Sequence, residues 1–218
     1  MENEEIVHQL LRVLKIRKGE KIIFFNGSGF DFEMRVDKLA GRYVSGKIIE
    51  KIKNGRDPKV DVHLYQSLIK KDKFEWVLEK CTELGVKFFH LVISERSIKT
   101  AFNMERALRI VQEATEQSGQ DRVPEIKDIK KFNQAVEEID RSSLNLLFDR
   151  SGKTAGDLKI SKDGVVNIFI GPEGGFGESE LNWAKEHDFI VASLGPRILR
   201  SETAAIVASA LYLTLNNN

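Results

Sequence analysis

Two loops carry the residue types in this sequence that are best suited to binding a ligand. The first, GPEGGFG, spans 171–177, the second, LGPRILRSETA, spans 194–204, and each comes at the end of an apolar stretch. Four of the seven residues in the first loop are glycines. Because glycine loses more conformational freedom on folding than any other residue, this density predicts that the backbone closely approaches a bound group. The alternative is an ordinary turn between a strand and a helix.

The charges in the first loop indicate what kind of group it would bind. Glu173 places a carboxylate among backbone amides, and the loop has no lysine that could pair with a phosphate. A carboxylate in this setting suits a ligand with ribose hydroxyls or a positive charge. S-adenosylmethionine has both, because its sulfonium is cationic.

The second loop combines apolar and cationic side chains. Ile198 and Leu199 stand between two arginines. Apolar side chains in a loop could line an adenine pocket, while the arginines could hold RNA phosphate or a developing anion. The alternative is that Ser201 and Glu202, which follow, only cap the last helix.

Several familiar ligand motifs are excluded by their spacing. The segment SGKT at 151–154 resembles the end of a phosphate-binding loop, but Leu147 stands where that motif needs a glycine. No G-x-G-x-x-G follows a predicted strand, and the sequence has no H-E-x-x-H or paired C-x-x-C. The absence of these motifs excludes a dinucleotide fingerprint and makes a zinc site unexpected. Cys81 lies on the apolar face of a predicted helix, so we expect it in the core.

Composition limits the class of protein further. The chain has 218 residues, a formal net charge of +1 and a single cysteine, so an internal disulfide is impossible and a cytosolic location is expected. No apolar run reaches the roughly 18 residues of a membrane span, and the acidic start does not resemble a secretory signal. Residues 1–57 hold 12 Lys and Arg against 9 Asp and Glu, a net +3. A cationic cluster lies there, at Arg12, Lys15, Arg17, Lys18 and Lys21. It fits either an RNA contact or a solvated face.

Hydrophobic periodicity predicts two regions. The first has an amphipathic helix over 6–14 and strands at 21–25, 30–36 and 43–52, with a hairpin turn at Asn26-Gly27. Phe30, Phe32, Met34 and Val36 should share the buried face of the second strand. Residues 53–58 form the best linker.

In the second region, predicted strands alternate with predicted helices. Gly85 should end one helix and Asn103 should begin another. The strands are expected at 60–65, 86–93, 144–148, 165–170 and 190–194, and the helices at 74–84, 103–118, 178–187 and 201–213. This alternation predicts an α/β domain with a mainly parallel sheet and a ligand site at the carboxyl ends of its strands.

Together, the two loops resemble those of the bacterial ribosomal RNA (uridine-N3)-methyltransferases called RsmE. The resemblance rests on IGPEGG at 170–175 with Glu180, and on LGPRILR at 194–200 followed by ETA at 202–204. It extends over nearly the whole chain. Further matching positions are His8, 12–14, Lys73, Glu75, Lys80, 83–86, 94–97, 113–114, 116–118 and 123–126.

The resemblance implies a SPOUT-type fold, whose mainly parallel sheet contains a trefoil knot that general rules of topology argue against. It also implies a PUA-like RNA-binding β domain at 1–57, a methyltransferase domain at 58–218, and a homodimer with the cofactor pocket near the interface. The expected substrate is a uridine of 16S ribosomal RNA, either as small-subunit RNA or within the assembled subunit.

The cofactor residues follow from the resemblance position by position. S-adenosylmethionine is expected at Ile170, Gly171, Pro172, Glu173, Gly174, Gly175, Leu194, Gly195, Ile198 and Leu199. Glu202 is the candidate base, and Arg200 is the candidate for stabilising the uridine anion or gripping phosphate. The residues expected to bind RNA are Arg12, Lys15, Arg17 and Arg122.

The chain departs from the family pattern in two respects. It is expected to lack the first stretch of the N-terminal module, and Gln120 stands where the family usually has an arginine. Two alternatives stay open: a methyltransferase of the same fold that acts on a ribose 2′-hydroxyl, and an RNA-binding relative without catalytic activity.

Overall fold

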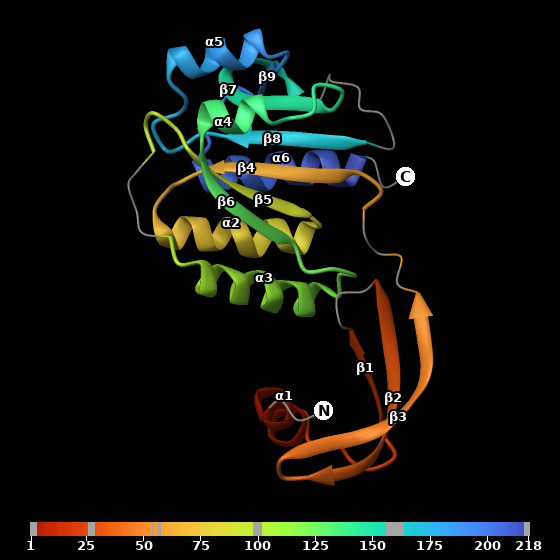
Figure 1. Cartoon of the computed structure of the whole chain (residues 1–218). Coiled ribbons are helices and arrows are strands. Elements are labelled where there is room, and N and C mark those ends of the chain that lie inside the picture. The colour runs from red at the N-terminus through yellow and green to blue at the C-terminus, as the bar shows by residue number, and fades with distance from the viewer. Residues whose placement is uncertain are drawn as a thin grey trace. The chain divides into compact units, whose positions relative to one another are not determined.

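The chain divides into two units, Met1–Arg56 and Asp57–Asn218, and each has a sheet of its own (Figure 1). The computed structural model describes residues 4–25, 29–53, 55, 58–97, 102–155 and 164–215. The predicted hairpin turn at Asn26-Gly27 lies outside the described residues, as do residues 54, 56 and 57 of the predicted linker at 53–58. None of the described helices is both long enough and apolar enough to cross a membrane.

The first unit is a three-stranded antiparallel sheet with one helical segment. The sheet has the order β1-β2-β3, formed by β1 (Lys21–Phe25), β2 (Phe30–Ala40) and β3 (Tyr43–Lys53). The predicted helix is confirmed, but only α1 (Glu4–His8) is α-helical, and η1 (Gln9–Val13) continues it as a π-helix.

The predicted buried face of β2 is confirmed in one half only. Met34 and Val36 are buried, whereas the Phe30 and Phe32 rings are only half-buried. The Lys51 ammonium lies 3.9 Å from the centroid of the Phe30 ring, on the neighbouring strand β3. At this end of β2, the Phe30 ring therefore contacts the Lys51 ammonium. A cation over the face of an aromatic ring is a favourable contact.

The second unit contains the predicted α/β sheet, and its strand pairings are all parallel. The strand order is β6-β5-β4-β8-β7-β9. The strands are β4 (Asp61–Ser67), β5 (Phe88–Ile93), β6 (Glu125–Lys131), β7 (Leu144–Thr154), β8 (Val165–Ile170) and β9 (Ile190–Ser193). Parallel strands end at the same edge, so the loops after β8 and β9 meet there.

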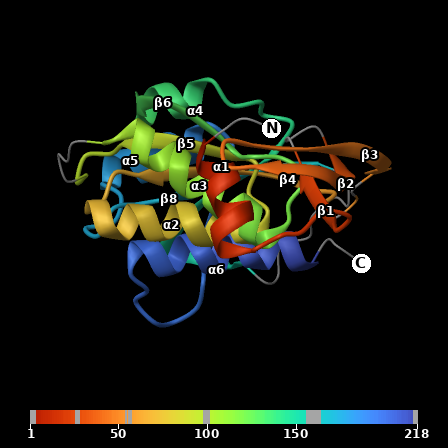
Figure 2. The same ribbon diagram turned by 90° about the horizontal axis from the view of Figure 1, so that it is seen from below.

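Helices cover both faces of this sheet. The core on one face involves α2 (Lys71–Leu84), α3 (Met104–Ser118) and α6 (Ser201–Leu215), and the core on the other involves α4 (Phe132–Glu137) and α5 (Glu178–Glu186). Successive residues of a strand point to opposite faces, so Leu146 joins the first core and Leu147 the second. Figure 1 shows α4 and α5 on the opposite side of the sheet from α2 and α3, and Figure 2 shows α2 beside α6.

Local signals at the helix ends are confirmed. Gly85 ends α2 with a φ of 105°, a left-handed conformation that glycine adopts without strain. At the start of α3, the Asn103 side chain accepts a hydrogen bond from the Arg106 N–H. Cys81 is fully buried in the core, as predicted, and its burial raises the pKa of the thiol to about 12.

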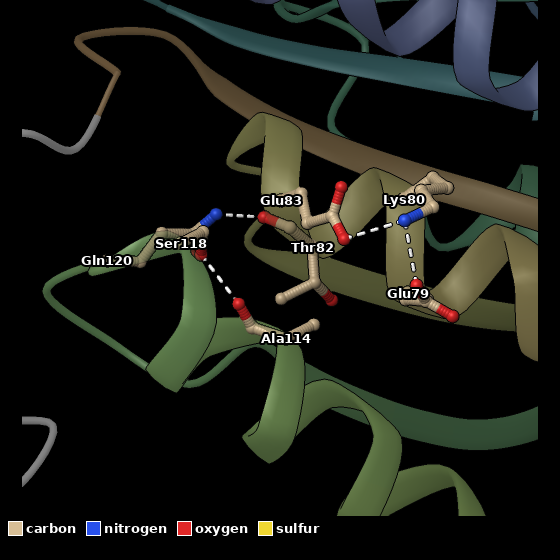
Figure 3. Close-up of polar contacts among 7 residues, drawn as sticks. All are labelled: Glu79, Lys80, Thr82, Glu83, Ala114, Ser118 and Gln120. Atoms are coloured by element: carbon tan, nitrogen blue, oxygen red, sulfur yellow. Dashed lines mark hydrogen bonds and ion pairs between the residues drawn. The ribbon is translucent and has the colours of Figure 1, made fainter.

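Gln120, which stands where the resemblance predicts an arginine, joins the ends of α2 and α3 (Figure 3). Its side-chain amide donates to the carbonyl of Thr82. The Ser118 hydroxyl donates to the Ala114 carbonyl at 2.7 Å. On α2, the Lys80 ammonium lies 2.7 Å from a Glu79 carboxylate oxygen and 2.8 Å from one of Glu83. Gln120 therefore has a structural role here, because its hydrogen bond to Thr82 connects the segment after α3 to the end of α2.

Candidate functional site

A cavity of about 300 Å³ lies at the carboxyl ends of β7, β8 and β9. Both glycine-containing loops line it, as the parallel topology requires. All ten residues expected to bind the cofactor are among its lining residues: Ile170, Gly171, Pro172, Glu173, Gly174, Gly175, Leu194, Gly195, Ile198 and Leu199. Their role in binding stays a prediction, but the fold brings them to one place.

The first loop brings bare backbone to this cavity. The Gly175 N–H donates to the Pro172 carbonyl at 2.9 Å, which closes a turn, and Gly175 has a φ of +70°. A Cβ built on Gly174 would lie 3.3 Å from the side chain of Arg96. Glu173 is exposed, and its carboxylate lies 3.5 Å from the Lys70 backbone nitrogen. Left-handed backbone therefore favours glycine at position 175, and a side chain at position 174 would contact Arg96 closely.

Ser201 connects the second loop to the first. Its hydroxyl donates to the Gly171 carbonyl at 2.6 Å and accepts from the Gln66 side-chain nitrogen at 3.0 Å. The sequence predicts Ser201 only as a helix cap. Its buried hydroxyl instead holds the two loops of the cavity together.

Sequence reasoning missed several lining residues, including Asp149 and Arg150. They belong to β7, which continues beyond the predicted end at Phe148. Both Phe148 and Lys153 pair with Ala192 of β9, so the residues between them form an irregular segment at the cavity. Missed lining residues outside this segment include Arg96, Phe176 and Ser193.

Gly152 makes this irregularity possible. A Cβ on Gly152 would lie 2.5 Å from the backbone carbonyl carbon of Ala192, too close for any other residue. The segment at 151–154, rejected as a phosphate-binding loop, is thus the end of a strand. The available signal was a short polar run with a glycine directly after an apolar strand.

The two predicted catalytic residues lie in a second cavity, of about 590 Å³. It is lined by Lys73, Trp76, Ile198, Leu199, Arg200, Glu202 and Thr203. Ile198 and Leu199 line both cavities, so the two spaces adjoin across this pair. The Glu202 carboxylate is buried and lies 3.5 Å from the Lys73 ammonium.

Comparison with known proteins fits this arrangement. Residues 56–213 match the family model of the RNA methyltransferase domain. The ribosomal RNA small subunit methyltransferase E of Bacillus subtilis is 32% identical over 219 residues, which covers 94% of this chain and 85% of that protein. The chain belongs to this family. Its Aquifex aeolicus member is also 32% identical, over 93% of this chain and 88% of that protein.

Solved structures agree with the family. A ribosomal RNA small subunit methyltransferase E from Neisseria gonorrhoeae, bound to S-adenosylmethionine, is 33% identical, with a TM-score of 0.89 over 97% of this chain and 90% of that one. A Legionella pneumophila protein in complex with the same cofactor is 30% identical, with a TM-score of 0.86 over 98% and 90%. The predicted SPOUT-type α/β fold and the enzyme class, an rRNA methyltransferase, are confirmed, while the knot stays a prediction.

The four residues expected to bind RNA in this chain are all exposed. Arg12, Lys15 and Arg17 belong to the first unit, where the Arg17 N–H donates to the Glu20 carboxylate at 2.9 Å. Arg122 belongs to the second unit and follows α3. Each is accessible to a phosphate, and their role stays a prediction.

Proposed function

We propose that this chain transfers a methyl group from S-adenosylmethionine to N3 of a uridine in 16S ribosomal RNA. The observation that carries the proposal is the cavity, in which two loops typical of the family are joined by Ser201 and present bare glycine backbone. The predicted donor is confirmed by the Neisseria and Legionella relatives, whose structures contain it. The uridine and its position follow from the resemblance to the family.

The residues present fit this donor. The cavity volume, about 300 Å³, is at the lower end of the range for small-molecule sites. Ile198 and Leu199 would contact the adenine, and the carboxylates of Asp149 and Glu173 suit ribose hydroxyls and the sulfonium. The bound donor would supply an electrophilic methyl group.

The second cavity would take the target base. N3 of uridine carries a proton and lies on the pairing edge, so the base has to leave its helix before it can react. Glu202 would accept the N3 proton, and Arg200 would stabilise the negative charge that develops on the base.

We further propose that the chain acts as a homodimer in the cytoplasm, where its ribosomal RNA substrate lies. Large apolar side chains are exposed on neighbouring elements: Trp76 of α2, Ile198 of the second loop and Val207 of α6 are 49%, 73% and 41% exposed. Figure 2 shows α2 and α6 side by side. Exposed apolar side chains on neighbouring elements favour an interaction surface.

Methylation mapping tests the proposed reaction. We expect the purified protein to methylate 16S RNA or small subunits from a strain that lacks the gene, and mass mapping should find one added methyl group on a uracil at N3. A methyl group on a ribose would contradict the base assignment and support the 2′-hydroxyl alternative. If S-adenosylmethionine binds but no RNA is methylated, the chain is a relative without catalytic activity.

We also propose that the first unit is a PUA-like RNA-binding domain. Replacing Arg12, Lys15 and Arg17 with alanine should weaken RNA binding and lower the slope of log affinity against log salt by about 2–3, since each phosphate contact contributes about 0.7–0.9. Cofactor affinity should not change. A matched control replaces Lys38, Lys47 and Lys53 with alanine, which removes the same charge from the strands of this unit. Equal slopes for both triple variants would show that the cluster is only a solvated face.

A further inference from the structure

Glu180 is a buried carboxylate at the start of α5, and it connects two loops beside the cofactor cavity. It is only 6% exposed. One carboxylate oxygen accepts the Gly177 N–H at 2.9 Å and the other accepts the Glu95 N–H, also at 2.9 Å. Gly177 ends the first glycine loop, and Glu95 belongs to the loop after β5. A single side chain therefore satisfies backbone donors from two segments that are distant in sequence.

The neighbouring contacts carry this connection to the cavity. Arg96, which follows Glu95, donates from Nη1 to the Gly174 carbonyl at 2.9 Å, and both residues line the cavity. The Ser179 hydroxyl donates to a Glu95 carboxylate oxygen at 3.2 Å. A Cβ on Gly177 would lie 2.1 Å from that same Glu95 oxygen, so the two segments are closely packed.

We infer that Glu180 is a positioning residue for the cofactor cavity. By holding the two loops, Glu180 fixes the Arg96 side chain and the Gly174 carbonyl relative to each other. The inference rests on the proposed cofactor site. The competing view is that Glu180 only caps α5, since a glutamate at the third helical position commonly bonds back to the N-cap amide. Capping requires one oxygen, and the bond from the second oxygen to the Glu95 N–H lies outside the helix.

Glu180→Gln separates these two roles. Glutamine keeps the size of the side chain but replaces one acceptor oxygen with an amino group, which cannot accept from either backbone N–H. We expect the dissociation constant for S-adenosylmethionine, measured by calorimetry, to rise about 10- to 100-fold, the range that one lost charge-assisted hydrogen bond corresponds to. The affinity should fall because part of the free energy of cofactor binding must then be used to order the two loops.

Glu178→Gln is the matched control. Glu178 is exposed in the same first turn of α5, so its replacement removes the same charge from the same helix end. Because wild type and this control are titrated with the cofactor in the same series, a failure of both to bind it would contradict the proposed function and not the role of Glu180. Amide hydrogen exchange without cofactor gives a second readout: Glu180→Gln should speed exchange in residues 94–97 and 172–177, and Glu178→Gln should not.

Ser179→Ala covers the case in which Glu180→Gln does not fold. It breaks only the exposed bond to Glu95, and we expect a rise of about 2- to 5-fold in the dissociation constant, the effect of one ordinary hydrogen bond. A cap-only role predicts a lower melting temperature with cofactor affinity and loop exchange equal to those of Glu178→Gln. That result, or an unchanged affinity in Ser179→Ala together with unfolded Glu180→Gln, overturns the inference.

Discussion

Glu202→Gln is expected to lower the single-turnover rate of methyl transfer roughly 10²–10⁴-fold, the usual contribution of a general base. Glutamine fills the same space and can still accept a hydrogen bond, but it cannot take the N3 proton. Cofactor affinity should barely change, because Glu202 lies in the second cavity and not among the residues that line the first. The defect should shrink as pH rises, since uridine then loses its proton without help.

The ion pair with Lys73 makes a control necessary. Glu202 lies 3.5 Å from the Lys73 ammonium, so its replacement also removes a partly buried pair and lowers stability. Lys73 is 38% exposed, which keeps this loss on the order of 1 kcal/mol. Lys73→Met removes the same pair and leaves the carboxylate, so any rate defect it has should not shrink at high pH. The measurement is single-turnover transfer to a target RNA over a pH series, with melting temperatures recorded for both variants.

Arg200 offers a further comparison within the same cavity. A guanidinium cannot act as the general base that takes the N3 proton, so the defect of Arg200→Ala should be the same across the series. A Glu202→Gln enzyme within about threefold of wild type, well below the range for a general base, would leave Glu202 as the structural partner of Lys73.

The parallel sheet could be predicted because its central strands are nearly continuous apolar runs. The β8 segment, VVNIFI, is buried along almost its whole length, as expected for a strand covered on both faces. The edge strand β6 was missed because its sequence, EIKDIKK, is mostly polar and mostly exposed. The following helix, α4, has only six residues, too few to show a helical period.

The cofactor cavity was predicted where the evidence is local, and missed where it depends on pairing between distant segments. The two loops could be predicted from their composition: four glycines in 171–177, and an apolar pair between two arginines in 194–204. Asp149 and Arg150 reach the cavity only because β7 pairs twice with Ala192, and no short-range pattern encodes that register. The roles of Glu180 and Ser201 are likewise hydrogen bonds to residues 85 and 30 positions away.

Residues that are neighbours in the sequence of the second loop line different cavities. Ile198 and Leu199 face both cavities, while Arg200 and Glu202 line only the second. The chain enters α6 at Ser201, and successive helical residues point about 100° apart. The sequence analysis places Ile198 and Leu199 with the cofactor and Arg200 and Glu202 with the base, but it could not predict that Ile198 and Leu199 line both cavities.

Gly175→Val is expected to lower the affinity for S-adenosylmethionine by about 100-fold or more, the upper part of the range for overfilling a packed site. Gly175 lines the cavity and its φ is +70°, so a β-branched residue is strained there. A Cβ at this position would meet no atom within 4 Å, so the added methyl groups would occupy open space that the cofactor needs.

Gly119→Val separates the lost cofactor space from the backbone strain. Gly119 ends α3 with the same φ of 70°, and it is not among the residues that line the cavity. Both variants should therefore lose similar stability, about 1–2 kcal/mol by denaturant unfolding, but only Gly175→Val should lose cofactor binding by calorimetry. If the two variants bind the cofactor equally well, the first glycine loop does not hold it, and the assignment of the cavity between 170 and 199 would have to be abandoned.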